Sequence, residues 1–120
     1  MAVTVTNQSN PLATKLVQDT AVTNTAVDNA TGAAGTLYMV EIDNSNYGTI
    51  VYFKLANATS ATVGTTAASL VLMCGASVKR SYVFPEGIGF DGFSHWCVTS
   101  ASEANTTAPG TPPTVRYVTS

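Results

Sequence analysis

Short runs of β-branched and aromatic residues, separated by turn residues, constrain the fold of this 120-residue chain more than any other feature of its sequence. Such runs lie at 37–43, 49–55, 69–74, 77–84, 96–99 and 114–118, with weaker candidates at 3–6 and 16–27. Each has about the length of one strand. Turn signals recur roughly every eight to twelve residues, a spacing typical of sandwiches and barrels. The sequence therefore predicts an all-β, single-domain antiparallel β-sandwich with a jelly-roll-like topology.

The runs at 37–43 and 49–55 are joined by the turn-rich segment Asn44–Gly48. A connection of this length favours an antiparallel hairpin, so we expect the two strands to pair. Both faces of the second run carry bulky side chains, as in a strand that lies inside a sandwich or against another subunit. Gly87–Phe93 alternates glycine with bulky residues and predicts a bent connection.

Charged residues make up only 10% of the chain, against roughly 25% in a typical soluble domain. Five Lys or Arg residues and a net charge of −2 disfavour a protein that binds nucleic acid through its phosphates. The longest nearly apolar stretch, residues 67–76, is shorter than the ~20 residues of a membrane helix. The first residues show no secretory signal. We therefore expect no nucleic-acid or membrane partner, and synthesis in the cytoplasm.

The single histidine, His95, precedes Trp96 and shares a strand face with Cys97. A nucleophilic pair or a metal site could use such an arrangement, but zinc needs four ligands and no second pair is evident. We expect His95 to be a strand-end histidine beside a core tryptophan. Cys74 and Cys97 are expected to be buried thiols, with a single disulfide between them as the alternative.

Two other patterns could carry chemistry. Glu41 and Asp43 share a strand face, as an acid–base pair or a calcium site would need, but the wet side of an edge strand explains them more simply. Gly87, Gly89 and Gly92 spell G-x-G-x-x-G, yet the residues after them have the pattern of a strand, whereas a dinucleotide fold needs a helix there. The sequence thus predicts no catalytic residue, no cofactor and no metal, and the chain is not expected to be an enzyme.

Aromatic side chains raise the alternative of a carbohydrate-binding module. Tyr47, Tyr52 or Trp96 could stack on a sugar ring. Most aromatic residues of the chain occupy alternating strand positions, where packing in the core is the simpler explanation. The scarcity of charge, combined with strands that are apolar on both faces, favours instead a surface that other subunits cover.

Four segments resemble small structural proteins of tailed bacteriophages: Thr36–Asn44, Val51–Leu55, Phe84–Phe90 and Trp96–Thr99. The resemblance covers residues 36–118 and implies a compact β-sandwich on the virion, without an active site. Among such proteins, capsid cement (decoration) proteins of this size commonly form trimers at local threefold positions of the shell. The resemblance therefore implies a homotrimer that bridges neighbouring subunits of the major capsid protein. A neck or tail adaptor, or a fibre-attachment protein, is the alternative.

We divide the chain into an extended N-terminal arm, residues 1–15, and a β-sandwich domain, residues 16–120. The arm has strand-forming Val3 and Val5 and could add a strand to the sheet edge of another chain. The residues expected at an interface between subunits are Val3, Val5, Tyr52, Lys54 and Tyr117.

Overall fold

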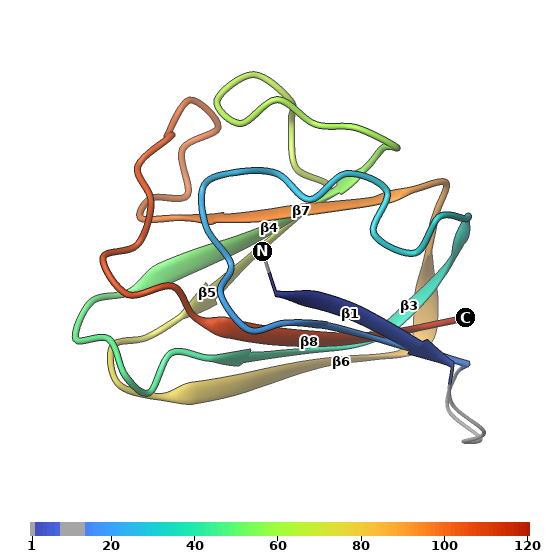
Figure 1. Cartoon of the computed structure of the whole chain (residues 1–120), viewed down its shortest axis with the longest axis horizontal. Coiled ribbons are helices and arrows are strands. Elements are labelled where there is room, and N and C mark those ends of the chain that lie inside the picture. Colours follow the sequence, from blue (N-terminus) through green and yellow to red (C-terminus); the bar gives the residue numbers. More distant parts are fainter. Residues whose placement is uncertain (1, 8–13) are drawn as a thin grey trace.

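The computed structural model describes residues 2–7 and 14–120 and shows two antiparallel β-sheets that pack face to face (Figure 1). The larger sheet contains β1 (Val3–Asn7), β2 (Lys15–Asp19), β3 (Gly35–Asp43), β6 (Lys79–Phe90) and β8 (Thr114–Thr119). The smaller sheet contains β4 (Val51–Asn57), β5 (Leu70–Cys74) and β7 (Phe93–Val98). The described ranges contain strands and no helix, so the prediction of an all-β sandwich is confirmed.

The strand order is that of a jelly roll with one weakly formed strand. The larger sheet has the order β1-β2-β8-β3-β6, and the smaller one has the order β5-β4-β7. The segment after β2 continues the smaller sheet beyond β7: the N–H of Val27 donates to the carbonyl of His95 at 2.9 Å, and the reverse bond measures 3.1 Å. Each sheet therefore holds strands from both halves of the chain, and the jelly-roll-like topology is confirmed.

The predicted hairpin between residues 37–43 and 49–55 is wrong, because β3 and β4 belong to different sheets. The turn between them is held by Asn44, whose side-chain amide donates to the carbonyls of Thr49 and Gly75 at 2.9 Å each. The bond to Thr49 closes the turn itself, and the bond to Gly75 fastens it to the chain just after β5, a strand of the other sheet. The chain is thereby directed across the sandwich instead of back along β3.

The edge strand β6 is longer than predicted and continues through Pro85 to Phe90. Proline is tolerated because β6 is the last strand of its sheet, where one side of the backbone needs no partner. The register shifts between Leu37 and Met39 on the facing strand, so the Pro85 region bulges outward. Within this bulge Gly87 has a φ of +75°, which glycine adopts without strain. The bent connection expected at 87–93 is therefore corrected to a bulged strand and a tight turn.

The expected N-terminal arm is part of the sheet where the structure describes it. β1 pairs with β2 of the same chain, with Val5 opposite Val17, and β2 already begins at Lys15. A valine-containing strand finds its backbone partners on the nearest open edge, which here belongs to its own chain. Residues 3–7 of the expected arm thus form an edge strand of their own chain's sheet, and residues 1 and 8–13 of the arm lie outside the described residues.

Two apolar clusters stabilise the sandwich. The main core fills the space between the sheets and contains the inner side chains of both. A second, smaller cluster lies on the outer face of the smaller sheet, where Trp96 and Val98 pack against Val63 and several alanines from the loops. Figure 1 shows these loops, residues 58–69 and 99–113, above β4 and β7. All six residues of β7 are buried as a result.

Candidate functional site

A hydrogen-bonded network of three buried polar side chains joins the two sheets. His95 points inward from β7, and its Nε2 atom lies 2.9 Å from Oδ2 of Asp19 on β2. Its Nδ1 atom lies 2.9 Å from the hydroxyl oxygen of Tyr117 on β8. An ionised carboxylate only accepts, so Nε2 donates to Asp19 and Nδ1 pairs with the hydroxyl of Tyr117. Both ring nitrogens are therefore engaged in contacts within the protein.

Burial and hydrogen bonding set the proton affinities of this network. Burial raises the pKa of Asp19, but hydrogen bonds from His95 and from the Ala21 N–H outweigh it and leave the pKa below its usual value of 3.8. Burial, together with the nearby Asp19 carboxylate, raises the pKa of Tyr117 well above its usual value. Asp19 therefore stays charged and Tyr117 stays protonated at neutral pH.

The network is closed to substrates. His95 has no exposed surface, and Asp19 and Tyr117 are almost as deeply buried. Cys97 lies on the same inner face of β7, and burial raises the pKa of its thiol to about 12, so it is not a nucleophile at neutral pH. Both cysteines are free and buried, as predicted. Within residues 2–7 and 14–120, no three His, Cys, Asp or Glu side chains gather where they could hold a metal ion.

Glu41 and Asp43 share the outer face of β3, as the alternation predicts, but β3 is an inner strand of the larger sheet and not an edge. Arg116 is the cross-strand partner of Glu41, and the Lys79 amine lies 3.9 Å from Oδ2 of Asp43. Hydrogen bonds from Ser45 keep the pKa of Asp43 below its usual value. Asp43 thus belongs to a surface ion pair and Glu41 lies opposite a cation, an arrangement that does not single them out as an acid–base pair.

Of the expected interface residues, two are buried and are corrected here. Tyr117 lies in the core beside His95, and Lys54 is buried under the loop that follows β7, where its amine donates to the carbonyl of Ser102 at 2.7 Å. Strand alternation places Lys54 on an outer face correctly, but it does not show that a loop covers that face. Trp96 is buried by the same loops and cannot be a stacking platform for sugars.

The other three expected interface residues reach the surface. Val5 is 42% exposed on the edge strand β1, and Val3 beside it is partly buried. Tyr52 is partly buried on the outer face of the smaller sheet, next to Met73 of β5.

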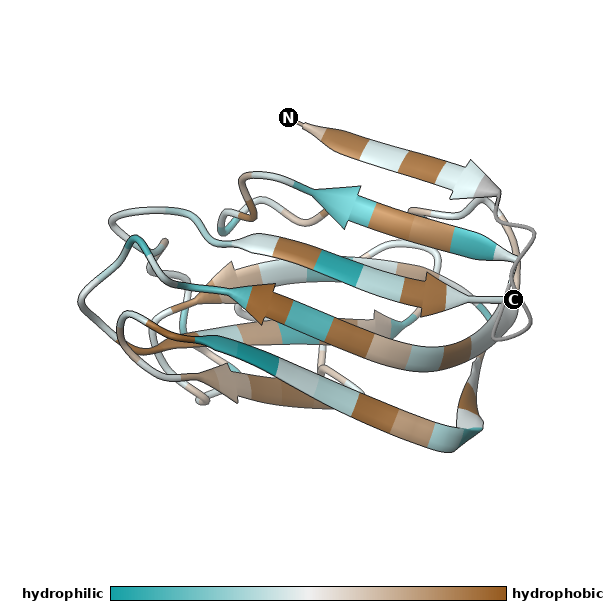
Figure 2. Cartoon of the chain, turned by 90° about the horizontal axis from the view of Figure 1, so that it is seen from below, coloured by the Kyte–Doolittle hydropathy of each residue, from teal (hydrophilic) through white to brown (hydrophobic). Residues whose placement is uncertain are grey.

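Figure 2 views the larger sheet from its outer side, which we call the open face, and the strand register places an apolar row across four strands of this face. Cross-strand partners place Leu16, Val118, Met39 and Val83 side by side, and we call these four residues the outer row. Val83, at the β6 edge, is 61% exposed. The row could not be found from the sequence, because it depends on the register of four strands that are distant in the chain.

A second exposed apolar area lies on the opposite face of the sandwich. Val71 and Met73 project from the outer side of β5, at the edge of the smaller sheet, and both are exposed. Tyr52 is the cross-strand partner of Met73. This edge extends beyond the part of the smaller sheet that the loops cover. We call these three residues the β5 patch.

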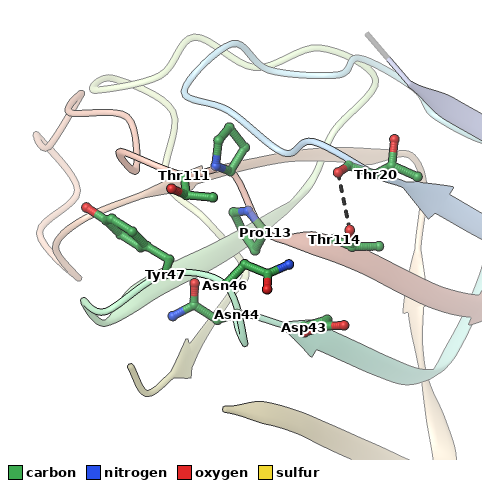
Figure 3. A pocket seen from close by; sticks show the side chains of 9 residues that line it. Thr20, Asp43, Asn44, Asn46, Tyr47, Thr111, Pro113 and Thr114 are labelled. Atoms are coloured by element: carbon green, nitrogen blue, oxygen red, sulfur yellow. Dashed lines mark hydrogen bonds between the residues drawn. The ribbon is translucent and has the colours of Figure 1, made fainter. Parts of the chain in front are cut away.

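A polar cavity of about 140 Å³, which we call the end pocket, lies at one end of the sandwich (Figure 3). It is formed where the end of β2, the turn after β3 and the start of β8 meet. Its lining consists of Thr20, Asp43, Asn44, Asn46, Tyr47, Thr111, Pro112, Pro113 and Thr114. Of the aromatic residues considered for sugar binding, it contains Tyr47 alone.

Gly87, Gly89 and Gly92 lie in β6 and in the turn to β7, and a strand follows them, as predicted. The pattern therefore forms no phosphate loop. Among the described residues there is also no helix with the length and hydropathy that crossing a bilayer would require. Comparisons of the chain with models of protein families, with curated proteins and with solved structures found no match to any of them.

Proposed function

We propose that this chain is a structural protein of a tailed-bacteriophage virion and acts there as a capsid cement (decoration) protein. The resemblance of residues 36–118 supports the assignment to a virion. The observation that carries the proposal is the open face, where Val83 is 61% exposed and Leu16 and Met39 of the outer row are partly exposed. Copies of the chain associate as a homotrimer, and the trimer bridges neighbouring subunits of the major capsid protein.

The charges of the open face favour contact with another copy. Two cations, Lys79 and Arg116, and two anions, Glu41 and Asp43, project from the strands beside the outer row. The face is therefore balanced in charge, so a second copy can place its anions opposite these cations without net repulsion. The outer row supplies the apolar contact that such an interface needs at its centre.

A cement protein needs a second surface that contacts the shell, and the β5 patch supplies it. The patch lies on the opposite face of the sandwich from the outer row, so both surfaces can be occupied at once. Three copies in one trimer present three such patches. Even a weak single contact then becomes strong through multivalency, which is how a small protein could reinforce a large shell.

The buried network supports a role without catalysis. His95, the one histidine of the chain, has both ring nitrogens bonded inside the core and none of its surface exposed. A general base must reach the proton that it removes from a substrate. The arrangement is instead that of a cross-link that fixes the two sheets relative to one another.

Multi-angle light scattering tests the self-association. We expect a mass three times the 12.4 kDa of the chain, and a monomer for the variant Val83→Glu, which places an unpaired charge in the outer row. The matched control is Val71→Glu, the same substitution in the β5 patch, which should leave the trimer intact. A monomeric wild-type chain, or equal loss of the trimer in both variants, would contradict the proposal.

Binding to shells that lack the protein tests the location. We expect the trimer to saturate the shell, and Val71→Glu to remain trimeric but bind with at least tenfold lower affinity, because each of three contacts is weakened. Cryo-electron microscopy of the decorated particles then gives the position. Density confined to the neck or tail would replace the cement role with that of an adaptor.

A further inference from the structure

The end pocket is too small and too polar for the organic cofactors that proteins commonly bind. Its volume of about 140 Å³ is well below the roughly 300 Å³ at which such sites begin. Its lining is made of amide, hydroxyl and carboxylate groups, with two prolines and one tyrosine as the apolar part. The ligand that fits is therefore a small molecule with many hydrogen-bonding groups.

Charge narrows the class of ligand further. Asp43 supplies a carboxylate that is paired with Lys79 outside the lining, and no cation lines the pocket, so nothing there would hold an anion such as phosphate. A divalent cation is disfavoured as well, because Asp43 is the only carboxylate there and one of its oxygens already accepts two hydrogen bonds from Ser45. The end pocket therefore favours a ligand without net charge.

The pocket contains a buried acceptor that lacks a donor. The side-chain nitrogen of Asn44 donates to two backbone carbonyls, but its Oδ1 atom is buried and has no hydrogen-bond partner among residues 2–7 and 14–120. The close-up shows this oxygen on the side of the amide that faces Tyr47 and Thr111 (Figure 3). A buried acceptor without a donor is unfavourable by itself, so a ligand hydroxyl that donates to it would be stabilised.

The walls of the pocket are fixed before any ligand arrives. The Tyr47 N–H donates to the carbonyl of Asn44 at 3.2 Å, and the Tyr47 carbonyl accepts from the Ser77 N–H at 2.9 Å. The ring of Tyr47 packs against Gly110, where an added Cβ would lie 3.1 Å from its Cε1 atom. Thr114 is held by a hydrogen bond from its hydroxyl to the carbonyl of Thr20. A preformed site of this kind binds with little loss of conformational entropy.

We propose that the end pocket binds a single neutral sugar ring. Asp43, Asn44 and Asn46 hydrogen-bond the hydroxyl groups of the ring, and Pro112 and Pro113 lie against its apolar face. This inference does not rest on the proposed virion role, since it concerns one end of the sandwich and shares only Asp43 with the open face.

Nuclear magnetic resonance titration of the ¹⁵N-labelled full chain tests the site. The probes are the methyl glycosides of glucose, galactose, mannose and N-acetylglucosamine, each added alone. We expect at least one of them to shift the amide signals of residues 43–47 and 111–114 saturably. Asn46→Ala removes an exposed side chain that makes no hydrogen bond to another described residue, and it should weaken binding about fivefold to tenfold.

Two matched variants show whether binding occurs in the pocket. Thr111→Trp places a large ring at its rim and should abolish the shifts. Thr107→Trp makes the same change at an exposed position of the same loop, outside the pocket, and should leave them unchanged. The inference is overturned if no glycoside causes saturable shifts, if Thr111→Trp binds as well as Thr107→Trp, or if calcium or phosphate, and no glycoside, shifts these signals.

Discussion

The two outer faces of the sandwich differ in what covers them. The smaller sheet is covered by its own loops, which bury Trp96 and even the amine-bearing side chain of Lys54. The larger sheet is wider, and no loop of the described residues crosses its outer face in Figure 2, where the outer row ends in the exposed Val83. Side chains under the loops therefore stabilise the monomer, whereas those on the open face, like those of the β5 patch beyond the loops, are available for contacts between molecules.

The largest effect is expected for Trp96→Ala on the covered face. Removing a buried indole leaves a cavity between β7 and the loops, and the free energy of unfolding should fall by about 3–5 kcal/mol. Denaturation with urea measures the change. Met39→Ala on the open face is the control and should cost less than half as much. Equal losses in the two variants would show that the faces do not differ.

The hydrogen bond between Asp19 and His95 lies between the two sheets and shows what a polar contact enclosed on all sides contributes, for comparison with the two outer faces. Asp19→Asn weakens the bond to His95 and should lower the free energy of unfolding by about 2 kcal/mol at neutral pH. Because folding lowers the pKa of Asp19, its charge stabilises the fold above pH 3.8, and this contribution is lost as the pH falls through the folded-state pKa. Unfolding measured between about pH 2 and pH 6 should therefore show a steeper decline in the wild-type chain than in Asp19→Asn. If the stabilities of the two proteins decline in parallel with falling pH, the charge of Asp19 does not stabilise the fold.

A smaller effect is expected for Lys54→Met, which keeps the length of a buried side chain and removes its charge. The lost hydrogen bond to Ser102 and the relieved burial of the charge oppose each other, so the free energy of unfolding should change by no more than about 1 kcal/mol. Burial lowers the pKa of Lys54, so the wild-type chain should gain stability relative to the variant as the pH rises toward 10.5. Thermal unfolding of both proteins at a series of pH values measures this gain in stability. If the wild-type chain shows no such gain, the Lys54 amine is hydrated in the folded state.

The smallest effect on the monomer is expected for Val83→Ser on the open face. Because its side chain is 61% exposed, the free energy of unfolding, measured at a concentration where the chain is monomeric, should change by less than about 0.5 kcal/mol. Self-association, measured by sedimentation at rising concentration, should nevertheless weaken. A large loss of stability without a change in association would assign Val83 to the fold alone.

The sequence predicted the strands better than their partners. Alternation identified most of the strands because it reflects the burial of each face, and it placed Glu41 and Asp43 together. It failed at the turn after β3, where length favoured a hairpin and the side chain of Asn44 decides otherwise.

Most of the candidate sites could not be predicted from the sequence. Asp19 and His95 are 76 positions apart, and nothing in either segment indicates that they meet. Lys54 was placed on an outer face but not under a loop, because a loop's path depends on contacts that no local pattern encodes. The end pocket likewise combines three segments that only the complete fold brings together.

The position of β8 has a consequence for how the protein is made. The last strand of the chain lies between β2, near its beginning, and β3. During synthesis, the edges of β2 and β3 that pair with β8 therefore stay unpaired until residues 114–119 have left the ribosomal exit tunnel. Truncation within this final segment should consequently yield aggregates in the cell instead of a shorter soluble domain.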